Sequence, residues 1–313
     1  MLFTDPYHLI GVDIGVSQIL AVELAGAGKR YRLKRIGQAK LSNKVMGATA
    51  MDDPVIVADT LTTLFRKGKF GTRHVALAVS GFGVTVKHLT VKRVDPAFLH
   101  DRILHVAEQY VPYPMASMYM DYRVLGNSAH HPGQMDVLMV AAPKTLVEKK
   151  VEAVRMANLA PLVVDVAPLA AANCYMFNNG AGRSAILLGV NAESVAITIV
   201  DTGVMRFTRH VEMALSANPD SAELVRVFYE TINRFKTSES SRNTDHVCLY
   251  GEQPQLATLK NALAQEPDFD VALLNPFQHI SIPAKLMTFE HEPLTGSRAA
   301  VGVGLALRKG AMP

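Results

Sequence analysis

The feature of this sequence that most constrains its fold is a strand–turn–strand plan that occurs twice. In residues 8–23 an apolar strand ends in Asp13, turns through Gly15 and Ser17, and resumes as a second apolar strand. Residues 184–211 repeat this plan with apolar strands separated by short polar turns. Two copies of one plan in a single chain predict two related halves on either side of a cleft.

The first turn has the chemistry to meet a phosphate group and its metal ion. Gly15 permits a turn that a Cβ atom would obstruct, while Asp13 and Ser17 offer a carboxylate and a hydroxyl. An ordinary N-terminal hairpin explains the same residues without any ligand, because short motifs match by chance. These residues taken alone leave both interpretations open.

Composition excludes several classes of protein. The chain has 313 residues, of which 49% are hydrophobic and 19% charged, so we expect a well-packed protein of two domains or one elaborate domain. Its 32 basic and 28 acidic residues nearly balance, and the Lys and Arg are scattered, which does not indicate a nucleic-acid partner.

Cysteine usage and hydropathy bear on the compartment. Cys174 and Cys248 are far apart and form no CxxC motif, so neither a disulfide framework nor a zinc site is expected, and a reducing, cytoplasmic setting fits. The N-terminus lacks a signal-peptide pattern, and no apolar run reaches the roughly 18 residues of a membrane span.

The remaining pattern predicts an α/β protein. Besides the two hairpins, we expect strands over residues 29–41, 74–80, 84–94, 118–124, 135–142, 161–166 and 245–250. Helices are expected over residues 55–65, 96–109, 144–158, 168–177, 222–235, 255–265 and 298–309. The last helix contains Gly302 and Gly304, whose low helix propensity predicts close contact with a neighbouring backbone.

Four stretches, in their order and spacing, carry a resemblance to a known family. They are residues 108–114 (EQYVPYP), 120–126 (MDYRVLG), 137–143 (VLMVAAP) and 163–166 (VVDV). The sequence resembles PilM, the actin-like cytoplasmic family of type IV pilus assembly proteins that is related to the cell-division protein FtsA. The resemblance extends over nearly the whole chain.

This resemblance implies an α/β, actin-like fold of the Hsp70 and sugar-kinase type. Two lobes flank a nucleotide cleft, and an FtsA-like subdomain is inserted in the first lobe. Here the first lobe would comprise residues 1–75, 159–180 and 296–313, the inserted subdomain residues 76–158, and the second lobe residues 181–295.

The resemblance also implies a function. PilM proteins bind the short cytoplasmic N-terminal segment of the inner-membrane protein PilN, which would make this chain a cytoplasmic scaffold, peripheral on the inner membrane, in pilus biogenesis and twitching motility. A PilO-like protein, the pilus assembly ATPase and the platform protein would be indirect partners. Main-chain hydrogen bonds and apolar pockets would hold the segment in a groove. The prolines of residues 110–114 indicate a stiff connector or a groove wall, and our candidate groove residues are Tyr110, Val111, Pro112 and Tyr113.

For the nucleotide cleft, the resemblance assigns Mg²⁺ to Asp13 through water and phosphate to the turn that follows. The second hairpin should repeat Asp-Ile-Gly but reads Gly189-Val190-Asn191, and the adenosine turn reads Gly251-Glu252-Gln253 instead of consecutive glycines. The candidate nucleotide-binding residues are Asp13, Gly15, Val16, Ser17, Gln18, Asn191, Gly251 and Glu252.

These departures bear on catalysis. Hydrolysis needs a metal ion and a water positioned by such groups, so we expect no catalytic residues and no enzyme, with ATP and Mg²⁺ left as open cofactors. The alternative is an active ATPase whose lobe closure regulates pilus assembly, or an FtsA-like filament. The last residues are too short for the amphipathic membrane anchor that such a filament would need.

Overall fold

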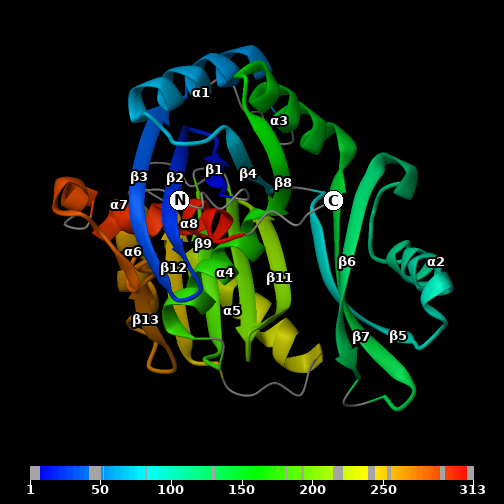
Figure 1. The fold of residues 1–313 in the computed structure, drawn as a ribbon. Helices are drawn as coiled ribbons and strands as arrows, with labels where there is room; N and C mark the ends of the chain where they lie inside the picture. The colour runs from blue at the N-terminus through cyan, green and yellow to red at the C-terminus, as the bar shows by residue number, and fades with distance from the viewer. Residues whose placement is uncertain are drawn as a thin grey trace.

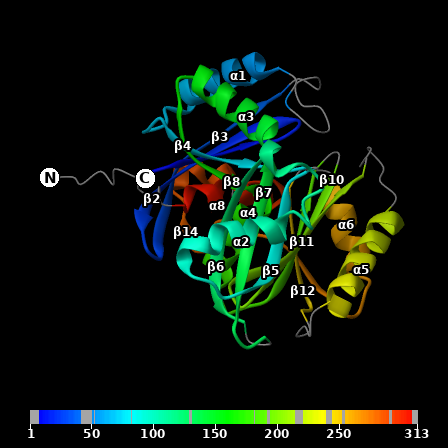
Figure 2. The ribbon, with the colours of Figure 1, turned by 90° about the vertical axis from the view of Figure 1, so that its right-hand side faces the viewer.

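The structure, a computed structural model, contains three β-sheets with helices packed between and around them (Figures 1 and 2). It describes residues 8–41, 51, 53–81, 83–128, 131–180, 182–191, 194–213, 221–238, 244–251, 255–289 and 293–308. No helix within these ranges is long and apolar enough to cross a membrane.

The first sheet has the strand order β14-β3-β2-β1-β4-β8. Its strands are β1 (Ile10–Ile14), β2 (Gln18–Ala27), β3 (Arg30–Lys40), β4 (His74–Val79), β8 (Ala160–Val166) and β14 (Ile280–Ser281). The central strand β1 runs antiparallel to β2 and parallel to β4. β1 and β4 are buried almost throughout, as expected for strands covered on both faces.

Helices cover both faces of this sheet. One face packs against α1 (Pro54–Gly68) and α3 (Lys144–Met156), which lie side by side in Figure 2. The other face packs against α4 (Ala167–Asn179) and α8 (Ala300–Ala306). α1 begins where the Asp53 carboxylate accepts hydrogen bonds from the amides of Val55 and Ile56, next to a proline in the first turn.

The predicted close contact of the last helix is confirmed. A Cβ atom on Gly304 would overlap the carbonyl group of Ala170 in α4, and one on Gly11 would overlap the carbonyl oxygen of Gly302. The helix is shorter than expected, however. α7 (Pro293–Arg298) ends at Arg298, and α8 begins two residues later.

The second sheet repeats the arrangement of the first. Its strands are β9 (Ala185–Val190), β10 (Ser194–Asp201), β11 (Val204–Glu212), β12 (His246–Gly251) and β13 (Asp270–Leu273), in the order β11-β10-β9-β12-β13. As in the first sheet, the first strand runs antiparallel to the second and parallel to the fourth. The repeat predicted from the sequence is therefore confirmed. α5 (Ser221–Ser238) and α6 (Gln255–Leu263) cover its outer face.

A third sheet, with the order β5-β7-β6, lies between β4 and α3 in the chain. It consists of β5 (Thr85–Lys92), β6 (Met118–Asn127) and β7 (Gln134–Pro143), and α2 (Pro96–Ala107) packs on it. The 3-10 turns η1 (Met115–Ser117) and η2 (Ala284–Phe289) complete the elements.

Strand pairing bears on the expected domain boundaries, which stay a prediction. β4 pairs within the first sheet as far as Val79, and α3 packs against α1 of the same lobe. The separate third sheet therefore spans only Thr85 to Pro143 of the expected insertion 76–158. β14 pairs with β3 of the first sheet although its residues fall within the range 181–295.

Candidate functional site

The turn between β1 and β2 is held by its own backbone and by side chains from other elements. The Gly15 amide donates to the Gln18 carbonyl (2.9 Å), and the Leu41 amide donates to the Ser17 carbonyl (2.8 Å). The buried side-chain oxygen of Gln18 accepts hydrogen bonds from Gln38 and Arg298. Gln18 therefore supports the turn, while Asp13, Gly15, Val16 and Ser17 remain partly exposed at its tip.

A buried lysine that we did not predict stands at the end of this hairpin. Lys150 of α3 is 2% exposed, and its Nζ donates to the carbonyl oxygens of Ile14 and Ala78, both at 3.0 Å. Burial lowers the Lys150 pKa to about 8, and the negative charge of nearby Asp13 opposes this shift. α3 thus brings a cation to the carboxyl ends of β1 and β4. In the sequence, Lys150 is spaced so that it falls on the apolar face of α3 with Leu146, Ala153 and Val154, and this pattern could have predicted a buried lysine.

The second hairpin is closed on itself. The Asn191 side-chain oxygen accepts a hydrogen bond from the Ser194 hydroxyl (2.9 Å), and the Asn191 amide donates to the Ser194 carbonyl (3.0 Å). Next to it, the buried ring of Tyr250 packs so closely on Gly189 that a Cβ atom there would lie 2.6 Å from the ring. The resemblance expects the second carboxylate at Gly189, which has no side chain and is covered by this ring, and Asn191 stands at the glycine of the motif.

The third element of the expected cleft is only partly described. Gly251 has a φ of +123°, and a Cβ atom there would overlap the Val190 carbonyl. Packing against β9 therefore explains the glycine without a bound nucleotide. Glu252 lies outside the described residues.

The two described hairpins bring different groups to the expected cleft. No group of three or more His, Cys, Asp or Glu within the described ranges could hold a metal ion. The carboxylate of Asp13 acts electrostatically on the buried ammonium of Lys150. The position of a second carboxylate across the cleft, which would help to position a metal or water, is occupied by Gly189.

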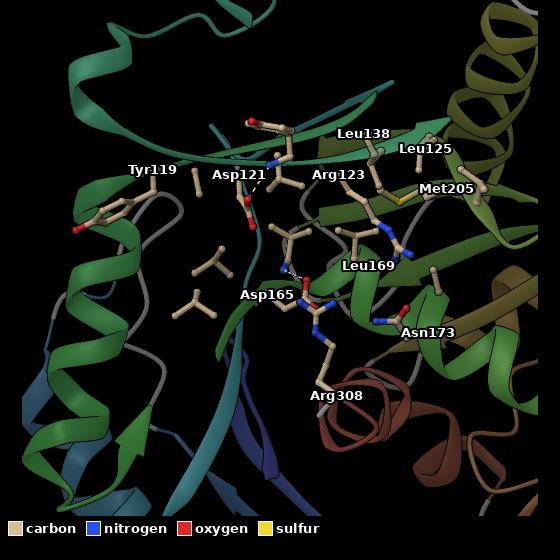
Figure 3. Close-up of a pocket in the computed structure, with 18 of the residues that line it drawn as sticks. Tyr119, Asp121, Arg123, Leu125, Leu138, Asp165, Leu169, Asn173, Met205 and Arg308 are labelled. Carbon is tan, nitrogen blue, oxygen red and sulfur yellow. Dashed lines mark hydrogen bonds and ion pairs between the residues drawn. The ribbon is translucent and has the colours of Figure 1, made fainter. Parts of the chain in front are cut away.

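An open groove lies elsewhere, between the first and third sheets (Figure 3). Its volume is about 620 Å³, and its walls come from β6, β7, β8, α4 and the turn between β10 and β11. Both β6 and β8 have only one neighbouring strand among the described residues. Edge strands carry backbone N–H and C=O groups that can pair with another extended chain.

The lining of the groove is mainly apolar. Large side chains on both edge strands remain exposed there, with Tyr119 at 46%, Val124 at 41% and Val164 at 38%. The Tyr119 hydroxyl donates to Glu148 (3.0 Å), and Lys144 lies 5.6 Å from the centre of the Tyr119 ring, so α3 fixes the start of β6. Exposed apolar side chains rimmed by polar groups are typical of a binding surface.

Charged groups lie at one end of the groove. Asp165 of β8 is 6% exposed and accepts a hydrogen bond from the Val166 amide (2.8 Å), and its other oxygen lies 3.3 Å from Nε of Arg308. Burial raises the Asp165 pKa, which Arg308 and the Val166 amide oppose. Figure 3 shows Arg308 meeting Asp165, with Arg123 and Asn173 nearby.

Comparison with known proteins identifies the family. A family model described as type IV pilus assembly protein PilM matches residues 11–214, well over half of the chain. The chain belongs to the PilM family. The resemblance predicted from the sequence is therefore confirmed.

Solved structures agree on the fold. A chain from a structure described as a PilM-PilN type IV pilus biogenesis complex has a TM-score of 0.82 at 22% identity, with 98% of this chain and 99% of that chain covered. The ethanolamine utilization protein EutJ from Carboxydothermus hydrogenoformans has a TM-score of 0.50 at 12% identity, with 96% and 89% covered. The actin-like two-lobed fold expected for a PilM-family chain is thus confirmed. A Bacteroides thetaiotaomicron protein of unknown function, described as having an actin-like ATPase fold, matches at a TM-score of 0.49 and 10% identity over 94% and 98% of the two chains.

The candidate groove residues of this PilM-family chain lie away from the groove of Figure 3. Val111 is buried in the core of the third sheet, Tyr113 packs against that core, and Pro112 is exposed. Tyr110 is exposed, with Lys87 lying 5.3 Å from its ring centre. None of the four is among the residues that line the groove. Their role in peptide binding stays a prediction. The sequence analysis did not identify the groove walls, because β6 and β8 look like ordinary alternating strands in the sequence.

Proposed function

We propose that this protein is a scaffold of type IV pilus assembly that holds an extended N-terminal segment of a PilN-like inner-membrane protein in the groove between β6 and β8. The observation that carries the proposal is a groove of about 620 Å³ whose two long walls are open sheet edges. A PilM relative of the same fold occurs in a complex described as PilM-PilN, which supports the choice of partner.

The groove has the features that strand addition requires. A segment lying along β8, which is seven residues long, would extend over about 23 Å at 3.3 Å per residue. Main-chain hydrogen bonds to one edge would supply affinity, and alternate side chains would enter the apolar floor of Leu138, Val140 and Leu169. Through that partner the protein is peripheral on the inner membrane, with PilO-like, ATPase and platform proteins as indirect partners.

A charge placed on either groove wall tests this proposal. Val124→Asp and Val164→Asp each put a carboxylate under the bound segment, where it would lose its hydration, so we expect at least a tenfold loss of affinity. The measurement is fluorescence anisotropy with a labelled synthetic peptide of the PilN-like N-terminal segment. Val55→Asp, an exposed valine on α1, is the matched control and leaves affinity unchanged. Equal affinity of all four proteins would show that the segment binds elsewhere.

The scaffold works without ATP hydrolysis in this proposal. Asp13 with its turn is the feature that favours the alternative, an ATP-hydrolysing actin-like protein, whereas the closed Asn191 turn and the internal cation of Lys150 oppose it. We expect titration calorimetry with ATP to give the same heat with Mg²⁺ as with a chelator, in wild type and in Asp13→Ala. Tight Mg²⁺-dependent binding that Asp13→Ala abolishes would favour the ATPase instead.

A further inference from the structure

Positive charge is concentrated in one part of this nearly balanced chain. Residues 24–73 contain eleven Lys and Arg but three Asp and Glu, a formal charge of +8 in a chain whose total is +4. The expectation that Lys and Arg are scattered does not hold for this stretch. Charge asymmetry of this kind indicates an interaction with an anionic partner.

The fold gathers nine of these cations along one side of the first sheet. Five lie on β3 and the turn before it, and four on the end of α1 and the loop that leads to β4 (Figure 1). The two groups meet at Gly71, where a Cβ atom would lie 2.7 Å from Nζ of Lys34 and 3.4 Å from Nη1 of Arg35. We refer to the nine as the basic edge: Lys29, Arg30, Arg32, Lys34, Arg35, Arg66, Lys67, Lys69 and Arg73.

One buried carboxylate organises the centre of the basic edge. Glu23 is fully buried and contacts Lys34 (2.7 Å), Arg35 (3.0 Å), His8 (3.2 Å) and the Gly71 amide (3.0 Å). Burial alone would raise the Glu23 pKa, but these hydrogen bonds, led by that of His8, outweigh it and lower the pKa to about 2. Glu23 is therefore ionised at neutral pH and offsets a single positive charge.

The other seven cations are available to a partner. Lys29, Arg30, Arg32, Arg66, Lys67, Lys69 and Arg73 are exposed and have no ion pair within the described part of the chain. The aromatic rings nearby face inward, since Tyr31 packs edge-on against Phe177 and Phe70 packs against Phe65. The basic edge thus presents charges without the stacking platform that single-stranded nucleic acids use.

The basic edge and the groove lie at opposite sides of one sheet. β3 is second from one end of the strand order, next to the two-residue β14, while β8 forms the other end. Figure 1 shows β3 on the left and β6 and β8 on the right. A ligand on the basic edge therefore leaves the groove open to the partner segment.

We propose that the basic edge binds the anionic phospholipid headgroups of the membrane in which the partner is embedded. That the protein stands beside a membrane rests on the proposed function, and the choice of headgroups rests on the seven unpaired cations. Clustered Lys and Arg are attracted to anionic lipid surfaces, and the attraction is screened by salt. Lipid contact would orient the scaffold and raise the local concentration of its binding groove around the partner segment.

Vesicle co-sedimentation of the full chain tests this proposal. We expect binding to vesicles of equal parts phosphatidylglycerol and phosphatidylcholine in low salt, and little binding in high salt or to phosphatidylcholine alone. The double variant Arg30→Glu/Arg32→Glu should lower the partition coefficient at least tenfold, since each cation near an anionic surface is worth about fivefold. Lys92→Glu/Lys260→Glu makes the same change of charge on the third sheet and on α6, and should bind as wild type does.

The outcomes separate this proposal from the groove proposal. Equal sedimentation with neutral and anionic vesicles, or an equal loss in both double variants, overturns lipid binding by the basic edge. Binding of a DNA duplex with no binding of anionic vesicles overturns it in favour of nucleic acid. Arg30→Glu/Arg32→Glu should retain wild-type affinity for the PilN-like peptide. If the wild-type protein binds anionic vesicles but not the peptide, only the groove proposal is refuted and lipid binding by the basic edge stands.

Discussion

The carboxyl ends of β1 and β9 occupy equivalent places in two sheets of the same topology, yet they are chemically unlike. At the end of β1 a partly exposed carboxylate, Asp13, lies near the buried ammonium of Lys150. At the end of β9 the corresponding turn contains Asn191, whose side-chain amide is hydrogen-bonded to Ser194. Two residues before it, Gly189 is covered by the ring of Tyr250. Both sheets place their first strand between the second and the fourth, and this shared topology does not require the polar strand ends to match.

The same contrast separates the cleft from the groove. Polar groups at the described hairpins are satisfied by neighbours within the chain: Gln18 by Gln38 and Arg298, Asn191 by Ser194. Along the groove, Val124 and Val164 are exposed on edge strands. Surface that the protein leaves uncovered is where a partner gains most by binding, which is why we place the function in the groove.

Lys150→Met gives the largest effect expected at these strand ends. The substitution leaves the buried carbonyls of Ile14 and Ala78 without their donor, and relief from burying an ammonium offsets only part of this loss. We expect a loss of about 2 kcal/mol in the free energy of unfolding, measured with urea. Lys149→Met, which removes one part-buried hydrogen bond to Met51, should cost less than about 1 kcal/mol. Equal losses would mean that the end of β1 does not depend on Lys150.

The pH dependence of the same pair sharpens the comparison. Burial, opposed by Asp13, lowers the Lys150 pKa from 10.5 to about 8. Between these values the unfolded chain binds the proton that the folded chain has released, so folding is favoured increasingly as pH rises. The stability of wild type relative to Lys150→Met should therefore increase from about pH 8 to pH 10.5. A flat difference would show that Lys150 is solvated in the folded state.

The sequence was sufficient for most of the fold because the fold follows apolar periodicity. The strands over residues 74–79 and 185–190 are nearly continuous apolar runs, and the repeated hairpins fixed the relation of the two large sheets. β13 and β14 escaped prediction because four and two residues are too few to show a period, and they are strands only through pairing with β12 and β3.

The site was less predictable for a physical reason. The groove walls β6 and β8 are separated in sequence by β7 and α3, and no local pattern marks two edges that meet only in the folded chain. Lys150 was visible as a lone charge on an apolar helix face, but its partners are main-chain carbonyls, which have no sequence signature. Asp13, Gly15 and Ser17 could be placed together in one turn from the sequence because turn chemistry is local, and their role in nucleotide binding stays a prediction.

Asn191→Asp gives the smallest effect and tests whether a carboxylate on the second turn is enough for catalysis. The position equivalent to Asp13 is Gly189, where the Tyr250 ring leaves no room for a side chain. Aspartate keeps an oxygen for the Ser194 hydroxyl, so we expect the free energy of unfolding to change by less than about 0.5 kcal/mol. We also expect no ATP hydrolysis in a phosphate-release assay, since Tyr250 still covers Gly189 and Lys150 remains near Asp13. Asn191→Ser is the matched control for loss of the amide without gain of charge. Hydrolysis that appears only in Asn191→Asp would mean that a single carboxylate on the second turn is enough for catalysis, and the cleft would then be a dormant ATPase rather than a structural seam.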